Sequence, residues 1–281
     1  MNTLTKSILK ISFATAMLGA SFAFAAEEDC LPQQDFDLIL SKIRVEQKDD
    51  NGQVVKTFDQ QDRCDKDDFK RWAGAVNFLF KLPRFTDIPS RFQSPVSKEG
   101  SASFLTKRIQ LMQMETLTMD SCAEGASAYV TKSEVSERKM HLCPIRKNAG
   151  TPLTLGSLLL HEARHIEGYS HVHCAKGPQS ELSLPACDET YQEQGSYGIG
   201  AALFFYVYKG TKNEVLKQEA RSMAITASLS TFNKPPLDIK EGALILGEDS
   251  KISFYDGQET FIGELEDDVS LILIDQTTPY A

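Results

Sequence analysis

The eleven residues from His161 to His171 restrict the fold of this chain more than any other stretch. His161 and His165 stand four positions apart, so on an α-helix they lie about 40° apart around the axis and project from the same face. His171 can meet them only if the helix ends and the chain turns back. Gly168 stands between His165 and His171 and can adopt the positive φ that such a turn requires. The sequence therefore predicts a helix that ends near Gly168 and brings the histidines together.

Glu162, directly after the first histidine, adds a chemical group to this arrangement. Imidazole nitrogens are preferred ligands of Zn²⁺, which they hold in a tetrahedron. A glutamate placed between two such ligands can reach a water molecule on the metal and act as a general base. Thr151 can cap the helix, and Pro152 suits its first position. The apolar residues that anchor the helix in a core are Leu153, Leu155, Leu158, Leu159 and Leu160.

The complete spacing, H-E-x-x-H-x-x-G-x-x-H, resembles the signature of the metzincin zinc peptidases. The resemblance covers these eleven residues. It implies a zincin-like catalytic domain that binds Zn²⁺ through His161, His165 and His171, with Glu162 as the catalytic base. Metzincins also place a methionine in a tight turn beneath the metal. Met223 is the candidate for that turn, although the residues around it have a helical pattern.

A predicted hairpin at residues 126–143 directly precedes the metal-binding helix. Its strands are expected at 126–130 and 139–143, with a charged connection between them. In zinc peptidases of the resembled class, an edge strand ahead of the metal helix aligns the substrate backbone. By that analogy the hairpin is a candidate substrate-binding edge, and an ordinary cross-linked hairpin is the alternative. His141 lies on it and is expected to be a surface or core residue rather than a catalytic one.

Other residues compete for the third ligand position. His173 is two residues beyond His171 and can replace it. Cys174 can supply a thiolate if it is not oxidised. In the thermolysin-like class the third ligand is a glutamate on a later helix, and Glu189 or Glu193 can fill that role. If they are not ligands, these two glutamates are expected to accept a hydrogen bond from a ligand imidazole.

A helix is predicted from residue 188 to residue 208, apolar nearly all round in its second half and therefore buried. Tyr191 and Tyr197 lie near its start. Each can stabilise a developing oxyanion, and the alternative role for both is packing.

The six cysteines predict a disulfide framework, because an even number in an exported chain indicates oxidised pairs. Pairing each cysteine with its neighbour in sequence closes loops of modest length. The last of these pairs would clamp the loop that carries His171. The predicted pairs are Cys30–Cys64, Cys122–Cys143 and Cys174–Cys187.

The first 25 residues resemble a bacterial secretory signal. Lys6 and Lys10 precede an apolar segment that is too short to span a membrane comfortably, and Ala-Phe-Ala at 23–25 fits a cleavage site. We expect cleavage near Ala25, export to the periplasm or outside the cell, and no stable membrane anchor afterwards. Loss of the two lysines changes the net charge from −9 to −11. Such an acidic chain lacks the basic patch that nucleic acid requires.

The remaining patterns predict an α+β fold in which a metal-binding helix accompanies a small sheet. Residues 26–236 are expected to form the zincin-like domain, and residues 237–281 a short antiparallel β appendage. Strands in the appendage are predicted at 243–246, 252–255, 260–262 and 269–274.

Within the larger domain, residues 54–58 predict a strand, and a helix is expected to end before Pro83. Residues 83–103 read as an irregular connection. Two segments, 36–45 and 105–119, fit either a helix or a strand.

These features favour an exported zinc metallopeptidase that acts on a peptide or protein substrate. Glu162 would be its general base. The alternative is a non-catalytic, disulfide-bonded binding protein that keeps zinc for structure. A zinc amidase acting on cell-wall peptides would share the metal chemistry and differ in its substrate.

Overall fold

The computed structural model describes residues 30–64, 67–85, 88, 90–123, 126–145, 150–175, 180, 185–234, 243–246, 251–255 and 259–264. The predicted signal at 1–25 and the predicted strand at 269–274 lie outside these residues. The chain divides into two compact units, one of residues 27–237 and one that includes residues 238–281. His161, His165 and His171 belong to the first unit.

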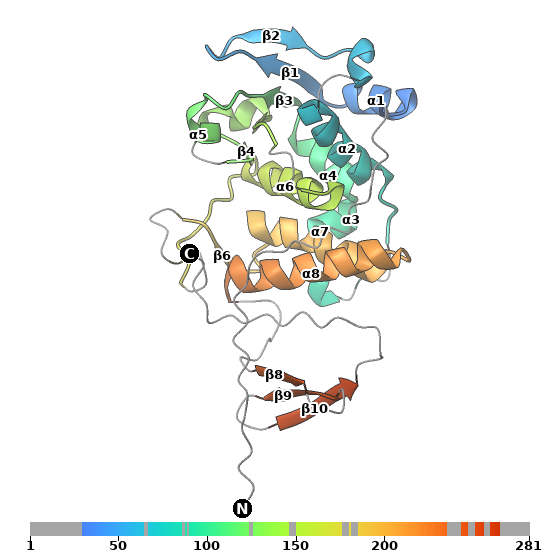
Figure 1. Ribbon diagram of the computed structural model, residues 1–281. Coiled ribbons are helices and arrows are strands. Elements are labelled where there is room, and N and C mark those ends of the chain that lie inside the picture. The colour runs from blue at the N-terminus through green and yellow to red at the C-terminus, as the bar shows by residue number, and fades with distance from the viewer. Residues whose placement is uncertain are drawn as a thin grey trace, which may run out of the picture. The chain divides into compact units, whose positions relative to one another are not determined.

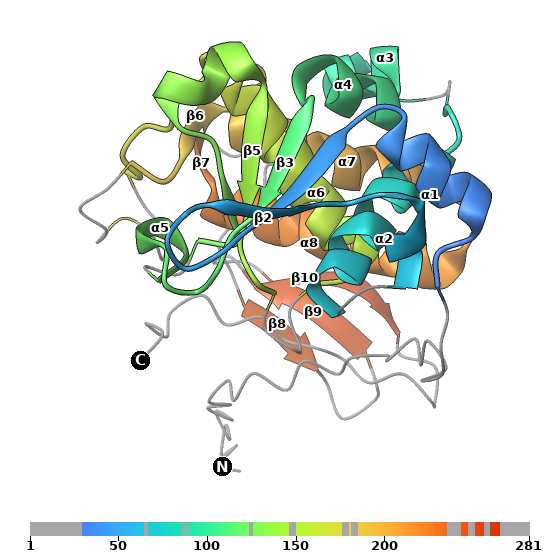
Figure 2. The same cartoon turned by 90° about the horizontal axis from the view of Figure 1, so that it is seen from above.

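A five-stranded mixed sheet forms one layer of the larger unit (Figure 2). Its strands lie in the order β2-β1-β3-β5-β4. The inner strands β1, β3 and β5 are parallel, whereas β2 and β4 pair antiparallel at the edges. Strand β2 confirms the strand predicted at 54–58. The strands are β1 (Arg44–Lys48), β2 (Val54–Thr57), β3 (Leu111–Met114), β4 (Ala128–Tyr129) and β5 (Lys139–Leu142).

Helices form the other layers, and α6 lies between the sheet and the helix pair α7 and α8 (Figure 1). The mixture of sheet and helices confirms the predicted α+β class. The helices are α1 (Gln33–Leu40), α2 (Asp67–Lys81), α3 (Pro95–Glu99), α4 (Ser101–Arg108), α5 (Asp120–Ala123), α6 (Pro152–His165), α7 (Ser196–Gly210) and α8 (Glu214–Ser230). Three 3-10 turns accompany them at Gln60–Cys64, Ser90–Phe92 and Lys132–Glu137.

The core holds α6 from both sides, with α2 against one flank and α7 against another. On α2, Phe69, Trp72, Val76 and Leu79 recur at helical spacing, and all four are buried. The Trp72 indole donates a hydrogen bond of 3.3 Å to the carbonyl of Cys143, which joins α2 to the end of β5. Helix α7 is buried along most of its length, as its apolar sequence predicts. The helix that carries the first two histidines is therefore rigidly enclosed.

The two ambiguous segments each contain a helix followed by a strand. Residues 36–45 include the end of α1 and the start of β1, and residues 105–119 include the end of α4 and all of β3. A single period fits neither segment, because the pattern changes from helical to extended within it.

The prediction of an irregular connection at 83–103 is wrong in its second half. Ser94 caps α3 by accepting a hydrogen bond from the backbone of Ser97, and the Ser97 hydroxyl accepts one from the backbone of Ser94. Pro95 occupies the first helical position, where its missing N–H costs nothing. The proline therefore starts a helix.

The predicted start of a helix at Asp188 is also wrong. Residues Asp188–Thr190 form β6, which pairs in parallel with β7 (Phe232–Lys234). A turn follows, in which Gln194 has a φ of 52°, and α7 begins only at Ser196. Pairing with a strand more than forty residues later overrides the local helical pattern.

All three predicted disulfides are present: Cys30–Cys64, Cys122–Cys143 and Cys174–Cys187. No free cysteine remains among the described residues. Disulfides persist in oxidising surroundings, so the chain fits the periplasm or the extracellular space. In the parts of the chain that the structure describes, no helix is long and apolar enough to cross a membrane.

The smaller unit contains an antiparallel sheet in the order β10-β9-β8. Its strands are β8 (Ala243–Leu246), β9 (Lys251–Tyr255) and β10 (Glu259–Glu264). They confirm the first three strands predicted for the C-terminal appendage.

Candidate metal centre

The helix that positions the first two histidines begins with a capping box and ends at a glycine turn. Thr151 and Thr154 exchange side-chain to backbone hydrogen bonds, and Pro152 occupies the first helical position. The helix ends at His165, and the backbone N–H of Gly168 donates to the His165 carbonyl over 2.9 Å. Gly168 has a φ of 85°, a conformation that glycine adopts without strain. The predicted turn of the chain after the helix is confirmed.

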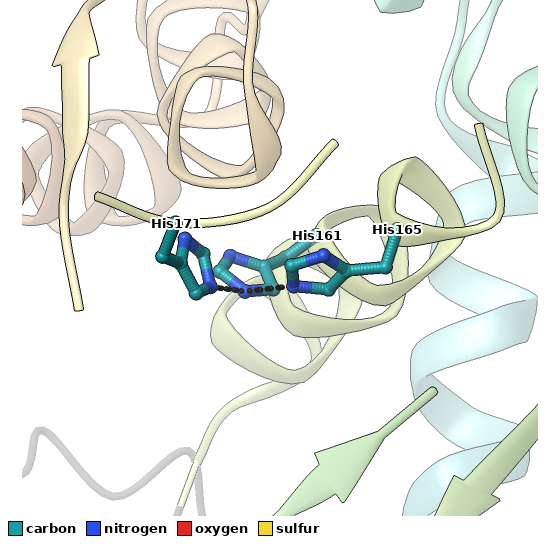
Figure 3. Close-up of side chains that lie close together, drawn as sticks. All are labelled: His161, His165 and His171. Carbon is teal, nitrogen blue, oxygen red and sulfur yellow. Dashed lines mark hydrogen bonds between the residues drawn. The ribbon is translucent and has the colours of Figure 1, made fainter. Parts of the chain in front are cut away.

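The turn brings three imidazoles together, as Figure 3 shows. His161 Nε2 lies 3.3 Å from His165 Nε2 and 3.2 Å from His171 Nε2. Two ligands of a tetrahedral ion with metal–nitrogen distances of about 2.0–2.1 Å are about 3.3–3.4 Å apart. The measured separations fit this value. The three histidines can therefore hold one metal ion on their Nε2 atoms.

Backbone and side-chain groups set the orientation of the ligand rings. His165 Nδ1 donates to the Tyr169 carbonyl over 2.6 Å, which leaves Nε2 free to bind a metal. His171 Nδ1 lies 3.5 Å from a carboxylate oxygen of Asp188. The other oxygen of Asp188 accepts a hydrogen bond of 2.8 Å from the backbone N–H of Gly198. Asp188 is therefore the carboxylate that faces a ligand imidazole from behind.

His161 and His165 favour the neutral form that metals bind. Burial lowers the pKa of His161 well below its usual value, and the nearby His165 and His171 lower it further. Burial also lowers the pKa of His165. Neutral imidazoles at neutral pH need not release a proton before they coordinate a cation.

Glu162 lies beside the ligands and is buried, with a relative exposure of 5%. Its Oε1 is 3.9 Å from His161 Nε2. Burial raises the pKa of this carboxyl from 4.5 to about 8. A carboxyl with such a pKa, placed next to a metal site, can accept and return a proton near neutral pH.

A cavity of about 530 Å³ opens over the histidines and Glu162. Tyr197 forms part of its lining, and its ring centroid lies 4.5 Å from that of His161 and 4.6 Å from that of His171. Burial raises the pKa of Tyr197, and the charges of Asp188 and Glu162 add to this effect. The remaining wall comes from α6, α7, α8 and the edge strand β4, with apolar side chains that include Leu158, Phe204 and Met223.

The predicted hairpin at 126–143 is present as β4 and β5, which pair antiparallel. The charged connection between them contains the 3-10 turn Lys132–Glu137. β4 is the last strand at its edge of the sheet, and Tyr129 and Val130 line the cavity. His141 was expected at the surface or in the core, and it is buried, with 3% exposure.

The competing ligands lie outside the cluster. His173 is exposed, and Cys174 is bonded to Cys187. Glu189 pairs with Lys234 at 2.9 Å, and Glu193 is exposed. Among the described residues, His161, His165 and His171 are the one group of such side chains that could hold a metal.

The structure gives Met223, Tyr191 and the two glutamates positions that differ from their proposed roles at the metal. Met223 lies within α8, so no methionine turn forms at this residue, although its side chain lines the cavity. Tyr191 is buried and donates a hydrogen bond of 3.2 Å to the Phe92 carbonyl, so its role is packing. Glu189 and Glu193 were expected behind a ligand imidazole, and Asp188 takes that position instead.

The Cys174–Cys187 pairing is the sequence signal for the position of Asp188. Asp188 follows Cys187, and the Cys174–Cys187 disulfide together with a bridge between Val172 and Cys187 returns the chain to the third histidine. A residue next to Cys187 is therefore brought beside His171.

Comparison of the chain with protein-family models, curated proteins and solved structures finds no significant match to any of the three.

Proposed function

We propose that this chain is an exported zinc metallopeptidase. One observation carries the proposal: three imidazole nitrogens converge at separations suited to one tetrahedral ion, and the buried Glu162 carboxyl lies beside them in the same cavity. Three histidine ligands suit zinc, and a catalytic zinc site keeps its fourth position open. Among the described residues no fourth His, Cys, Asp or Glu joins the cluster. This arrangement favours catalysis over the alternative of a closed structural site.

Each residue of the site has a separate role in the proposed peptide hydrolysis. Zinc at this site would polarise the peptide carbonyl and acidify a water molecule. The Glu162 carboxylate accepts a proton from the attacking water molecule. It then donates this proton to the leaving amine. Asp188 faces Nδ1 of His171 across 3.5 Å, and the Tyr197 ring lies against the rings of His161 and His171.

The edge strand offers a place for an extended substrate. Tyr129 and Val130 at β4 line the same cavity as the ligands. An extended peptide can add to such an edge and place its scissile bond over the metal. A mixed sheet with an antiparallel edge strand ahead of the metal helix supports a zincin-like fold. The likeness to metzincins rests on the eleven-residue signature, because Met223 lies in a helix.

Export is part of the proposal. Residues 1–25 act as the signal peptide, and three disulfides stabilise the mature chain in an oxidising compartment. The acidic mature chain acts on peptide or protein and does not bind nucleic acid.

The test is Glu162→Gln in zinc-loaded protein with casein as the substrate. Hydrolysis should fall by at least about a hundredfold, because a general base typically contributes 10²–10⁴-fold. Zinc content should stay at the wild-type level, because Glu162 is not a ligand. Normal hydrolysis by this variant would refute the assignment of Glu162 as the general base. Zinc-loaded wild-type protein that hydrolyses no peptide would favour the structural alternative.

A further inference from the structure

A row of side chains crosses the sheet on the face opposite the main core. Glu46, Gln113, His141 and Tyr129 occupy paired positions on β1, β3, β5 and β4. Their neighbours along the strands point into the hydrophobic core, so the row lies on the other face. Glu46, Gln113 and His141 are each at most 8% exposed. The row ends at the edge strand that borders the metal cavity.

Within this row, His141 stands between two carboxylates from outside it, Glu115 and Glu134. Its Nδ1 lies 2.5 Å from Glu115 Oε1, and its Nε2 lies 2.6 Å from Glu134 Oε2. Burial opposes ionisation of Glu134, yet hydrogen bonds from Lys139, Thr131 and His141 lower its pKa to about 2. Both ring nitrogens of His141 therefore lie within hydrogen-bonding distance of a carboxylate oxygen.

The His141 ring also contacts the edge strand β4. The His141 and Tyr129 rings stack with centroids 4.5 Å apart and planes 5° apart. β4 contains two residues, so its ladder with β5 offers few backbone hydrogen bonds to fix its position. Thr131, two residues beyond Tyr129, bonds Glu134 over 2.5 Å. Tyr129 therefore contacts His141 directly, and Thr131 is linked to it through Glu134.

We propose that His141 is a positioning residue for substrate binding: held between Glu115 and Glu134, it fixes Tyr129 and thereby the edge strand that receives the peptide. The inference rests on the proposed peptidase function, and it adds a residue outside the metal cavity to the binding of substrate. The two groups that complete the network are ammonium groups. Lys48 lies 3.0 Å from Glu115, and Lys139 pairs with Glu134.

His141→Phe separates this role from a general contribution to stability. Phenylalanine keeps a flat ring beside Tyr129 and removes both ring nitrogens, while Lys48 and Lys139 still neutralise the two carboxylates. Tyr129→Leu removes the stack and leaves the bonds of His141 intact. His173→Phe, at an exposed histidine outside the cluster, is the matched control.

Two measurements on the zinc-loaded full chain decide the inference. Hydrogen exchange of the amides at 126–131 should become at least about tenfold faster in both variants, with α6 within about twofold of wild type, because local opening is governed by local contacts. With fluorescein-labelled casein as the substrate, both variants should show a KM that is roughly tenfold higher and a kcat within about twofold of wild type. The reason is that the variants weaken the binding of the substrate and of the transition state equally and leave the chemical step unchanged. The control should change neither quantity.

Other outcomes overturn the inference. Unchanged exchange at 126–131 means that His141 does not fix the strand. Faster exchange throughout the larger unit would mean that His141 contributes only to stability. A fall in kcat without a change in KM would mean the same. If wild-type protein hydrolyses no casein, the proposed function fails, and the pattern of exchange still decides whether His141 positions the edge strand.

Discussion

The buried carboxyl of Glu162 should make the stability of the metal-free protein depend on pH. Burial raises its pKa from 4.5 to about 8 in the folded chain. Between these values the folded chain holds a proton that the unfolded chain has released, so the free energy of unfolding falls as the pH rises. The contribution is fully present below about pH 4.5 and is lost as the pH passes through 8. Between pH 6 and pH 9 the loss is about 3 kcal/mol by linkage.

The assay is urea unfolding of metal-free protein, with a chelator present and the disulfides intact, at pH 6 and pH 9. Glu162→Gln replaces the protonated carboxyl by a neutral group of similar shape, so this variant should lack the loss of about 3 kcal/mol. The histidine titrations are common to both proteins and cancel in the difference. Glu193→Gln, at an exposed position, should behave like wild type. If wild type and Glu162→Gln respond equally to pH, the reasoning about the buried carboxyl is refuted.

Three further variants test the residues that position the histidines. Asp188→Asn should weaken zinc binding about tenfold to a hundredfold, measured by competition with a chelating dye, because Asp188 orients a ligand ring. Gly168→Ala should lower the free energy of unfolding in urea by about 1–2 kcal/mol, because alanine is strained at a positive φ. No atom lies within 4 Å of an added Cβ, so no steric clash adds to this cost. Replacing Cys174 and Cys187 together by serine should cost about 3 kcal/mol in the same assay, because the 13-residue separation is no longer closed.

Each of these expectations has a contrary result. Unchanged zinc affinity in Asp188→Asn would mean that the carboxylate does not support His171. Wild-type stability of Gly168→Ala would show that the turn tolerates a side chain. A double serine variant as stable as wild type would place the loop under no constraint from the disulfide.

Local signals in the sequence were sufficient to predict the helix at 152–165 and the clustering of the three histidines. The cap at Thr151, the spacing of His161 and His165, and the glycine before His171 all act within one or two turns of chain. The disulfide pairs were also predictable, because each joins cysteines that are neighbours in the sequence. Features of this kind need no knowledge of distant contacts.

Features that depend on distant pairing were not predictable in the same way. Asp188 lies in a strand because β7 pairs with it, and this pairing moved the start of α7 to Ser196. The network of His141 with Glu115 and Glu134 forms only when β3, β5 and the 3-10 turn come together. Sequence periodicity contains no information about such meetings between segments.

The central claim is that His161, His165 and His171 form one zinc site. The most direct measurement is the zinc content of purified mature protein for wild type and for His171→Ala, counted per chain after reconstitution and removal of excess metal. We predict one zinc per chain in wild type and a clear loss in the variant, since three histidines form the site. Zinc retained by His171→Ala, or no zinc in wild type, would contradict the account.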